Sequence, residues 1–218
     1  FCDGPVDLIR DLSASGASLD LEINNPKNVA WAPDGLTFKS WTHIGTQHGA
    51  RKISEACRKS REITLEAWVV PAKASQTYEG VLIAMWEHPA RNFSLSQGAG
   101  SPGAYTASLR TGAADAVPKP LVAPKGTVET KPAHVVYTRE SAAGATRLYV
   151  NGTLIATGSA PSTFANWDPA MRLGLANEFT LNGAWLGELH LAAVYDRALS
   201  AGEVAQNYGA GADPPTTP

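Results

Sequence analysis

Strict alternation of polar and apolar side chains is the feature of this sequence that most limits its fold. In EITLEAWVVP, residues 62–71, every second side chain from Ile63 to Val69 is apolar, and threonine, glutamate and a tryptophan stand between them. A period of two places successive side chains on opposite faces of a strand, so one face of the segment can be buried. The segment therefore predicts a β-strand in a sheet that packs on that face.

About ten segments have strand character, and Gly- or Pro-marked turns separate them. They are NVAW (28–31), GLTF (35–38), EITLEAWVVP (62–71), GVLIAMWE (80–87), RNFSLSQ (91–97), AYTASLRT (104–111), AHVVYTRE (133–140), TRLYVNGTLIATG (146–158), MRLGLAN (171–177) and WLGELHLAAVYD (185–196). In RNFSLSQ the alternation predicts that Arg91, Phe93, Leu95 and Gln97 share one face. Because helix is scarce, the pattern predicts an all-β protein, built as a two-sheet antiparallel sandwich or jelly roll.

Local signals predict one hairpin and two short helices. Asn151 and Gly152 stand between apolar alternations, and both tolerate the positive φ angles of a type I′ turn, which predicts a hairpin there. RKISEACRKS (51–60) has the length for about two turns of helix. Ser200 followed by Glu203 is the capping-box pattern, so a short helix is expected close to the C-terminal end.

Composition bears on domain number and on the cellular setting. The 20 glycines and 15 prolines are spread through turns, which favours one domain over residues 1–209, and the Pro- and Thr-rich residues 210–218 are predicted as a linker or tail. A chain that begins FCDGPVD is expected to be a mature piece of something longer. In an exported protein Cys2 and Cys57 are expected to form a disulfide, whereas in the cytosol they would be free thiols.

Charge and hydropathy argue against two classes of partner. The net charge of -2 gives no long-range attraction to nucleic acid, and the basic segment RKISEACRKSRE (51–62) is interrupted by two glutamates, which is typical of a solvated turn. No apolar run approaches the roughly 20 residues that cross a bilayer. We therefore expect neither a nucleic-acid partner nor membrane insertion.

Motifs for catalysis are weak. GAGSPG (98–103) matches G-x-G-x-x-G, but a strand follows it where a dinucleotide site needs a helix, so it predicts a hairpin loop. A retaining glycosidase needs two carboxylates about 5–5.5 Å apart. GELHLAAVYD offers Glu188 with no second acid before Asp196. Glu62 and Glu66 share a face, but they lie too far apart and are expected to face water.

Sugar binding is the chemistry that the remaining polar residues favour. Arg, Asn, Gln and Glu side chains hydrogen-bond hydroxyl groups, and an aromatic ring covers the C–H side of a sugar. If the ends of several strands converge, a ligand-binding site forms from Arg91, Asn92, Gln97, Arg110, Asn177, Glu178 and Trp185. In this site Trp185 is expected to stack on the sugar. No catalytic residue and no cofactor is expected.

Several stretches resemble one known family. GELHLAAVYDRALSAGEV (187–204) is similar to the G-x-I-D-E-V-R-I-Y-N-R-A-L-S-x-x-E-[IV] ending of laminin-G-like, concanavalin A-like jelly-roll domains. ITLEAWVVPA (63–72) and RLYVNGTLIATG (147–158) resemble an internal strand and a hairpin of that family, and IRDLSASGASLDLEI (9–23) is more loosely similar to its opening segment. The resemblance implies two packed antiparallel sheets and a secreted, extracellular or periplasmic setting. It also implies a module that binds glycans or proteins and is often joined to other domains of the same polypeptide.

The resemblance also bears on calcium. Many relatives hold a structural calcium between the Asp of I-D-E-V and an N-terminal acid. Asp11 matches the N-terminal acid, but His190 stands where the other Asp is found, and a neutral imidazole is a poor ligand for a hard cation. Asp11 is therefore a weak calcium candidate. The next polar positions of the family pattern are Leu191 and Ala193 here, which predicts a covered central strand.

Three functions remain open at this point. The favoured one is a secreted, non-catalytic carbohydrate-binding module whose partner is a glycan or polysaccharide. The second is a polysaccharide hydrolase or lyase that uses Glu178 or Glu188. The third is a protein-interaction or structural module within a larger assembly.

Overall fold

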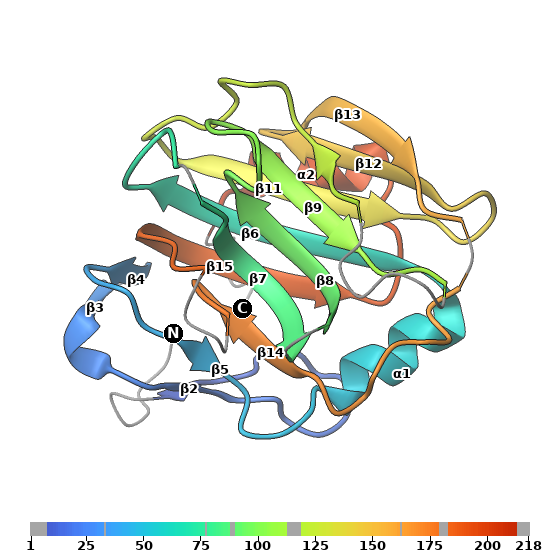
Figure 1. Ribbon diagram of the computed structural model, residues 1–218, viewed down its shortest axis with the longest axis horizontal. Coiled ribbons are helices and arrows are strands. Elements are labelled where there is room, and N and C mark those ends of the chain that lie inside the picture. Colours follow the sequence, from blue (N-terminus) through green and yellow to red (C-terminus); the bar gives the residue numbers. More distant parts are fainter. Residues whose placement is uncertain are drawn as a thin grey trace.

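Two antiparallel sheets, stacked face to face, form the protein in the computed structural model (Figure 1). The structure describes residues 8–32, 34–76, 78–87, 90–112, 119–161, 163–178 and 183–212. Within these residues one sheet has eight strands in the order β1-β2-β5-β14-β7-β8-β9-β10, and the other has seven in the order β13-β12-β11-β6-β15-β4-β3. The predicted all-β jelly-roll sandwich is confirmed.

The elements have the following bounds. The eight-stranded sheet contains β1 (Leu8–Ile9), β2 (Leu21–Ile23), β5 (Ile44–Gly45), β7 (Gly80–Glu87), β8 (Ala90–Gln97), β9 (Tyr105–Leu109), β10 (Leu121–Val122) and β14 (Arg172–Leu175). The seven-stranded sheet contains β3 (Val29–Ala32), β4 (Gly35–Phe38), β6 (Ile63–Pro71), β11 (Ala133–Arg139), β12 (Ala145–Val150), β13 (Thr153–Ser159) and β15 (Gly187–Tyr195). The helices are α1 (Arg51–Ser60), α2 (Ala201–Ala210) and a 3₁₀ turn, η1 (Pro26–Asn28).

The core lies between the two sheets and is built from the apolar side of the alternation. In β6, Ile63, Leu65 and Val69 are fully buried, and Phe93 and Leu95 of β8 belong to the same cluster from the opposite sheet. Full burial of one such side chain stabilises the fold by about 1.5–3 kcal/mol. The outward side chains of both sheets are therefore the ones left for other roles.

The predicted turn and helix signals are confirmed. Asn151 (φ 52°) and Gly152 (φ 73°) form the two-residue turn between β12 and β13. Ser200 and Glu203 form a complete capping box at the start of α2. Figure 1 shows α2 behind the seven-stranded sheet and α1 at one end of the sandwich. None of the described helices combines the length and apolarity needed to span a membrane.

Two β-bulges alter what the alternation predicts. The register of β7 with β8 shifts between Met85 and Trp86, so that Met85 pairs with Phe93 and Trp86 pairs with Arg91. Asn92 is the extra residue, and it turns Arg91 to the outer face, away from Phe93. The prediction that Arg91 shares the face of Phe93 is wrong for this reason. A second bulge lies in β15 between Leu189 and Leu191, and β15 is a central strand, as predicted.

Glu66 and the two cysteines bear on two further expectations. Glu66 was expected to face water but is 2% exposed, because α2 covers the outer face of β6. Cys57 is a free, buried cysteine, and burial raises the pKa of its thiol to about 12. Cys2 lies outside the described residues, so the structure gives the predicted disulfide no support. Residues 213–218, most of the predicted tail, also lie outside them.

Candidate functional site

The outer face of the eight-stranded sheet carries a polar layer centred on β7 and β8. Arg91, turned outward by the bulge, donates from Nη1 and Nη2 to the two carboxylate oxygens of Glu79, at 2.7 and 2.9 Å. Its guanidinium lies 3.9 Å from the ring centroid of Trp86, and Nη1 also donates to Ser94 Oγ at 2.9 Å. The hydroxyl of Ser96 donates to Glu79 Oε1 at 2.7 Å.

The Arg91–Glu79 pair is held ionised. Burial alone would raise the pKa of the Glu79 carboxyl, but the hydrogen bonds from Arg91 and Ser96 and the positive charge of Arg91 lower it below its ordinary value. A carboxylate with a lowered pKa is a poor general acid near neutral pH. Glu79 therefore serves to fix the guanidinium over Trp86.

Three N–H donors in this layer have no acceptor among the residues that the structure describes. They are Trp86 Nε1, Arg91 Nε and Arg110 Nε, each buried and without a hydrogen-bond partner. Arg110 directly follows β9, and its backbone N–H donates to the carbonyl of Asn92 at 2.8 Å, which sets it beside the start of β8. An unsatisfied buried donor costs about 1–3 kcal/mol. This donor patch, formed by Trp86, Arg91 and Arg110, is suited to a ligand that brings oxygen acceptors.

The loop after β14 brings two more predicted residues to the same face. Asn177 Oδ1 accepts hydrogen bonds from the backbone N–H groups of Glu178 and Gly183, at 2.9 and 3.2 Å, and so closes the loop. A Cβ atom on Gly183 would lie 2.8 Å from Val81 Cγ2 and 3.4 Å from Glu178 Cγ, so Glu178 lies beside the outward side chain of Val81. The geometry thus places Arg91 over Trp86 toward the end of β7 and Glu178 beside Val81 toward its start, on the same sheet, with the backbone of Arg110 next to the start of β8.

Three predicted site residues hold the fold together instead. Trp185 is 1% exposed, and its Nε1 donates to Gln97 Oε1 at 2.9 Å, while Gln97 Nε2 donates to the carbonyl of Lys73. Asn92 Nδ2 donates to the carbonyl of Asp168 at 3.1 Å, and Asn92 is fully buried. The expectation that Trp185 stacks on a sugar is corrected, because its ring lies in the core. There it is hydrogen-bonded to Gln97, whose side chain lies on the inward face of β8.

The two glutamates of the hydrolase hypothesis lie on opposite faces of the sandwich. Glu178 borders the eight-stranded sheet, whereas Glu188 is an exposed residue of β15 in the seven-stranded sheet, paired with Val70 and Thr37. They cannot act as one carboxylate pair across a glycosidic bond. The geometry therefore offers no two-carboxylate site from these residues.

The surroundings of Asp11 do not fit a calcium ion. Lys52 of α1 forms an ion pair with Asp11 Oδ2, and its ammonium also donates to Ser13 Oγ and the carbonyl of Ser15, each at 3.0 Å. Burial alone would raise the pKa of Asp11, but hydrogen bonds from Lys52, Ser13 and Leu19 hold it at about 2. The lysine ammonium thus takes the oxygen ligands that a cation would use.

His190 stands where relatives have the second calcium-binding Asp, and it lies in β15 of the seven-stranded sheet, whereas Asp11 follows β1 of the other sheet. His190 Nδ1 is 3.0 Å from the carbonyl oxygen of Asp34 in the turn between β3 and β4. Among the described residues, no cluster of three or more His, Cys, Asp or Glu side chains is arranged to hold a metal.

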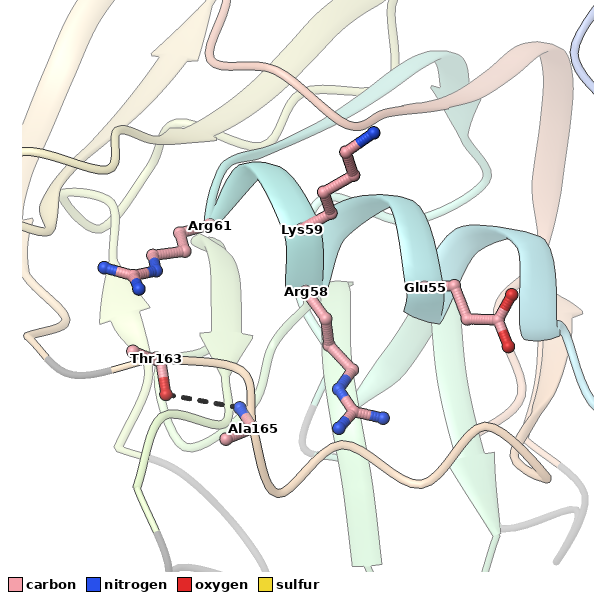
Figure 2. A pocket seen from close by; sticks show the side chains of 6 residues that line it. All are labelled: Glu55, Arg58, Lys59, Arg61, Thr163 and Ala165. Carbon is pink, nitrogen blue, oxygen red and sulfur yellow. Dashed lines mark hydrogen bonds between the residues drawn. The ribbon is translucent and has the colours of Figure 1, made fainter.

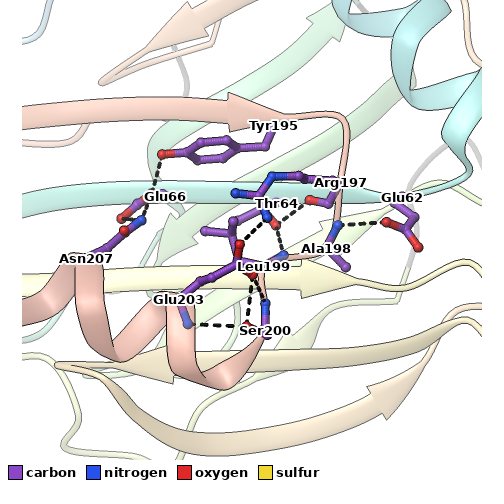
Figure 3. Close-up of polar contacts among 10 residues, drawn as sticks. All are labelled: Glu62, Thr64, Glu66, Tyr195, Arg197, Ala198, Leu199, Ser200, Glu203 and Asn207. Atoms are coloured by element: carbon purple, nitrogen blue, oxygen red, sulfur yellow. Dashed lines mark hydrogen bonds and ion pairs between the residues drawn. The ribbon is translucent and has the colours of Figure 1, made fainter.

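A second polar cluster lies under α2, on the outer face of the seven-stranded sheet (Figure 3). Glu66 Oε1 is 2.6 Å from His134 Nε2, and Glu66 Oε2 accepts from Tyr195 Oη at 2.7 Å. Asn207 of α2 donates to both oxygens, at 3.0 and 3.1 Å. Burial alone would raise the pKa of Glu66, but these hydrogen bonds lower it. Since both oxygens are satisfied by the chain itself, this cluster fastens α2 to the sheet.

A hollow of about 410 Å³ lies at the end of α1 (Figure 2). Its lining residues are Glu55, Arg58, Lys59, Arg61, Thr163 and Ala165. Arg61 ends the helix in the left-handed region at φ 60°. The segment RKISEACRKS, predicted as a short helix, is α1, and its last turn borders this hollow. A helical reading of RKISEACRKSRE was the signal for this, but its second wall, from residue 163 on, has no mark in the sequence.

Comparison with known proteins gives one family and several similar folds. Residues 45–205 match the sequence profile of the concanavalin A-like lectin/glucanases superfamily. No curated protein matches the chain in a sequence search. The CBM40 of a Ruminococcus gnavus IT-sialidase, bound to α2,3 sialyllactose, has a TM-score of 0.56 and 17% identity, and the match covers 74% of this chain and 91% of that one.

Two larger proteins contain a similar fold. Trypanosoma rangeli sialidase in complex with the inhibitor DANA gives a TM-score of 0.60 at 18% identity, covering 93% of this chain and 32% of the sialidase. The binding domain of botulinum neurotoxin DC, in complex with rat synaptotagmin II, gives 0.63 at 10% identity, covering 89% and 49%. At these identities the likeness shows the fold alone.

Proposed function

Because the chain belongs to the concanavalin A-like lectin/glucanases superfamily, we propose that it is a non-catalytic, glycan-binding module of the lectin type. We further propose that it acts outside the cell or in the periplasm, joined to other domains of a longer polypeptide. The R. gnavus module with this fold was solved with a sialylated sugar, which supports a glycan as the ligand class. Fractionation of the source cells tests the setting, and recovery from the cytosol would contradict it.

The donor patch is the observation that carries this proposal. Trp86 Nε1, Arg91 Nε and Arg110 Nε are buried donors that lack acceptors within the described parts of the chain, and sugars carry hydroxyl, ring and carbonyl oxygens in abundance. Arg110 is half-buried, so the patch reaches the surface there. A sugar oxygen that accepts from these donors would offset the cost of their burial. Glu178, beside Val81, adds an acceptor for sugar hydroxyls.

Binding is favoured over hydrolysis by the state of the carboxylates. The pKa of Glu79 is lowered by its pairing with Arg91, and Glu178 and Glu188 lie on opposite faces. A glycosidase needs an acid whose pKa is raised near a second carboxylate. We therefore propose that the glycan leaves the site unchanged.

The test is a glycan array with the whole chain, followed by titration calorimetry on the glycans retained. Two variants probe the patch: Trp86→Phe keeps an aromatic ring and removes one donor, and Arg110→Met keeps most of the side-chain volume and removes another. Each is expected to weaken binding about three- to tenfold, the usual worth of one hydrogen bond. The matched control is Arg147→Met, a half-buried arginine of β12 in the other sheet, paired with Glu140.

Three outcomes would contradict the proposal. One is no binding on the array together with capture of a protein partner, which would favour an interaction module. Another is release of reducing sugar or of an unsaturated product that Glu178→Gln abolishes, which would favour an enzyme. The third is equal affinity of the Trp86→Phe, Arg110→Met and Arg147→Met variants, which would place the sugar elsewhere.

A further inference from the structure

The hollow at the end of α1 has an unusual charge balance. Arg58, Lys59 and Arg61 are exposed, and none of them forms an ion pair with a described residue. Glu55, the one carboxylate among the described lining residues, is already paired with Arg51 at 3.2 Å. The hollow therefore presents cations without counter-ions.

The opposite wall is rigid and adds positive charge. Phe164, between the lining residues Thr163 and Ala165, is fully buried and stacks on Trp167 with ring centroids 4.5 Å apart. Arg139, also buried, lies 5.0 Å over the Phe164 ring and donates to the backbone carbonyl of Arg61. A guanidinium thus lies directly behind the hollow and joins its two walls.

Helix stabilisation does not account for the whole arrangement. Cations in the last turn of a helix interact favourably with its dipole, which is reason enough for Arg58 and Lys59. It gives less reason for Arg61, which lies beyond the last helical residue, while the buried Arg139 behind it is held by its own hydrogen bonds to the carbonyls of Arg61 and Ala160. Figure 2 shows Arg58 and Arg61 extending on either side of the Thr163–Ala165 segment, while Lys59 points the other way.

We propose that this hollow binds the sulfate or carboxylate group of an acidic polysaccharide, as a site separate from the donor patch. Arg58 and Arg61 have the planar, forked donors that match such oxyanions, and Thr163 has a hydroxyl that accepts from the N–H of Ala165 and leaves its own O–H to donate. The volume, about 410 Å³, is in the range of small-ligand sites, roughly 300–1,000 Å³.

A glycan fits the hollow better than a nucleic acid does. Among the described residues that line it there is no aromatic ring on which a base would stack, and single-stranded nucleic-acid sites depend on such rings. Glu55 is an acceptor for sugar hydroxyls but repels closely spaced phosphates. The inference rests on the proposed glycan-binding function and names the class of glycan.

The experiment is affinity electrophoresis of the whole chain in gels that contain dextran sulfate, polygalacturonate or neutral dextran. The test variant combines Arg58→Gln, which keeps helix propensity, with Arg61→Asn, because Asn tolerates the left-handed backbone of Arg61. The matched control, Arg147→Gln with Lys131→Gln, removes the same charge from two residues that are paired with Glu140 and Glu129. Circular dichroism confirms that both variants fold.

Wild type is expected to be retarded by one or both acidic polysaccharides, and salt should weaken the binding. The hollow variant is expected to lose at least about tenfold in affinity, since each charge-assisted hydrogen bond is worth more than a neutral one. The control should stay within about twofold, because its charges are distant and screened. The two acidic gels distinguish sulfate from carboxylate as the bound group.

Equal loss in the hollow variant and the control would overturn the inference, as would competition by poly(U) RNA at lower concentrations than the acidic glycans. Binding of neutral glycans without any preference for acidic ones would overturn this inference and leave the proposed function standing. Failure to bind any glycan would remove both.

Discussion

The outer faces of the two sheets carry similar residues and use them differently. Each has a buried or half-buried glutamate on a strand or next to one, close to a tryptophan: Glu66 near Trp68 on one face, and Glu79 near Trp86 on the other. Glu66 is completed by His134, Tyr195 and Asn207, and α2 lies over it. Under α2, His134 Nδ1 is left without a partner among the described residues, whereas the other face keeps the three donors of Trp86, Arg91 and Arg110 without acceptors there. Polar groups that the chain satisfies by itself support the fold, and polar groups that it leaves unsatisfied are candidates for binding.

Helix α2 is the cause of the difference. It brings Asn207 to Glu66 and stacks Tyr208 against Trp68, with ring centroids 5.8 Å apart. Among the described residues no helix covers the corresponding part of the eight-stranded sheet, as Figure 1 shows. The comparison therefore makes opposite predictions for the two faces, in stability for one and in binding for the other.

The largest effect is expected from Glu66→Gln. The new amide directs N–H groups at donors that now have no acceptor, so the free energy of unfolding should fall by about 2–4 kcal/mol. Urea unfolding followed by circular dichroism measures it. The control is Glu188→Gln, an exposed residue of the same sheet, which should stay within about 0.5 kcal/mol. Unchanged stability of Glu66→Gln, or loss of glycan binding at a temperature where it is folded, would break the comparison.

Arg91→Met is expected to lower the free energy of unfolding less than Glu66→Gln does. It is expected to weaken glycan binding strongly. The substitution leaves Glu79 unpaired, which should cost about 1–2 kcal/mol because the Glu79 side chain is still 24% exposed. The double variant Arg91→Met, Glu79→Met removes both charges and should recover most of that stability without recovering glycan binding. A double-mutant cycle with calorimetry on each protein measures both quantities. Recovery of binding in the double variant would contradict the role of Arg91 as a ligand donor.

Acidification should distinguish Glu66 from exposed carboxylates. The folded-state pKa of Glu66 is lowered, so its contribution is fully present above the unfolded value of about 4.3 and is lost as the pH falls through the folded value. Wild type should therefore lose stability between about pH 5 and pH 3, and Glu66→Gln should lose less. Urea midpoints at these pH values give the difference. Parallel loss in both proteins would mean that other carboxylates govern acid unfolding.

The smallest effect is expected from metal removal. Since Lys52 already neutralises Asp11, EDTA or added calcium should shift the melting temperature by no more than about 1 °C. Differential scanning fluorimetry with and without each reagent measures the shift. Stabilisation by calcium in wild type that is lost in Asp11→Asn would show that a cation displaces the lysine.

Local pattern predicted most of the fold, and the reasons are visible in particular residues. Three features depend on residues that are close in sequence: the alternation around Ile63, the Asn151–Gly152 turn and the Ser200–Glu203 capping box. The local sequence is therefore enough to predict them. The bulge at Asn92 is not, because it depends on how β7 and β8 align, and it alone decides that Arg91 faces outward.

The site was less predictable because burial depends on partners far along the chain. Glu66 meets Asn207, and Trp185 meets Gln97, in contacts that no spacing rule indicates. Arg110, Glu178 and Arg91 were chosen for their chemistry alone, and the structure places them on or beside the same sheet. Glu79 was overlooked because a single acid before a buried strand has no distinguishing mark.

The central pair of the seven-stranded sheet has a consequence for how the chain reaches this state. β6 pairs with β11 on one edge and with β15 on the other. The second edge of β6 (residues 63–71) therefore stays uncovered until residues 187–195 pair with it. Contacts between such distant parts of a chain make folding slow, and an uncovered apolar strand is prone to associate with other chains. During synthesis, the chain up to residue 186 would therefore carry an open strand edge. Slow assembly and a need for protection until the last strand arrives are therefore built into its topology.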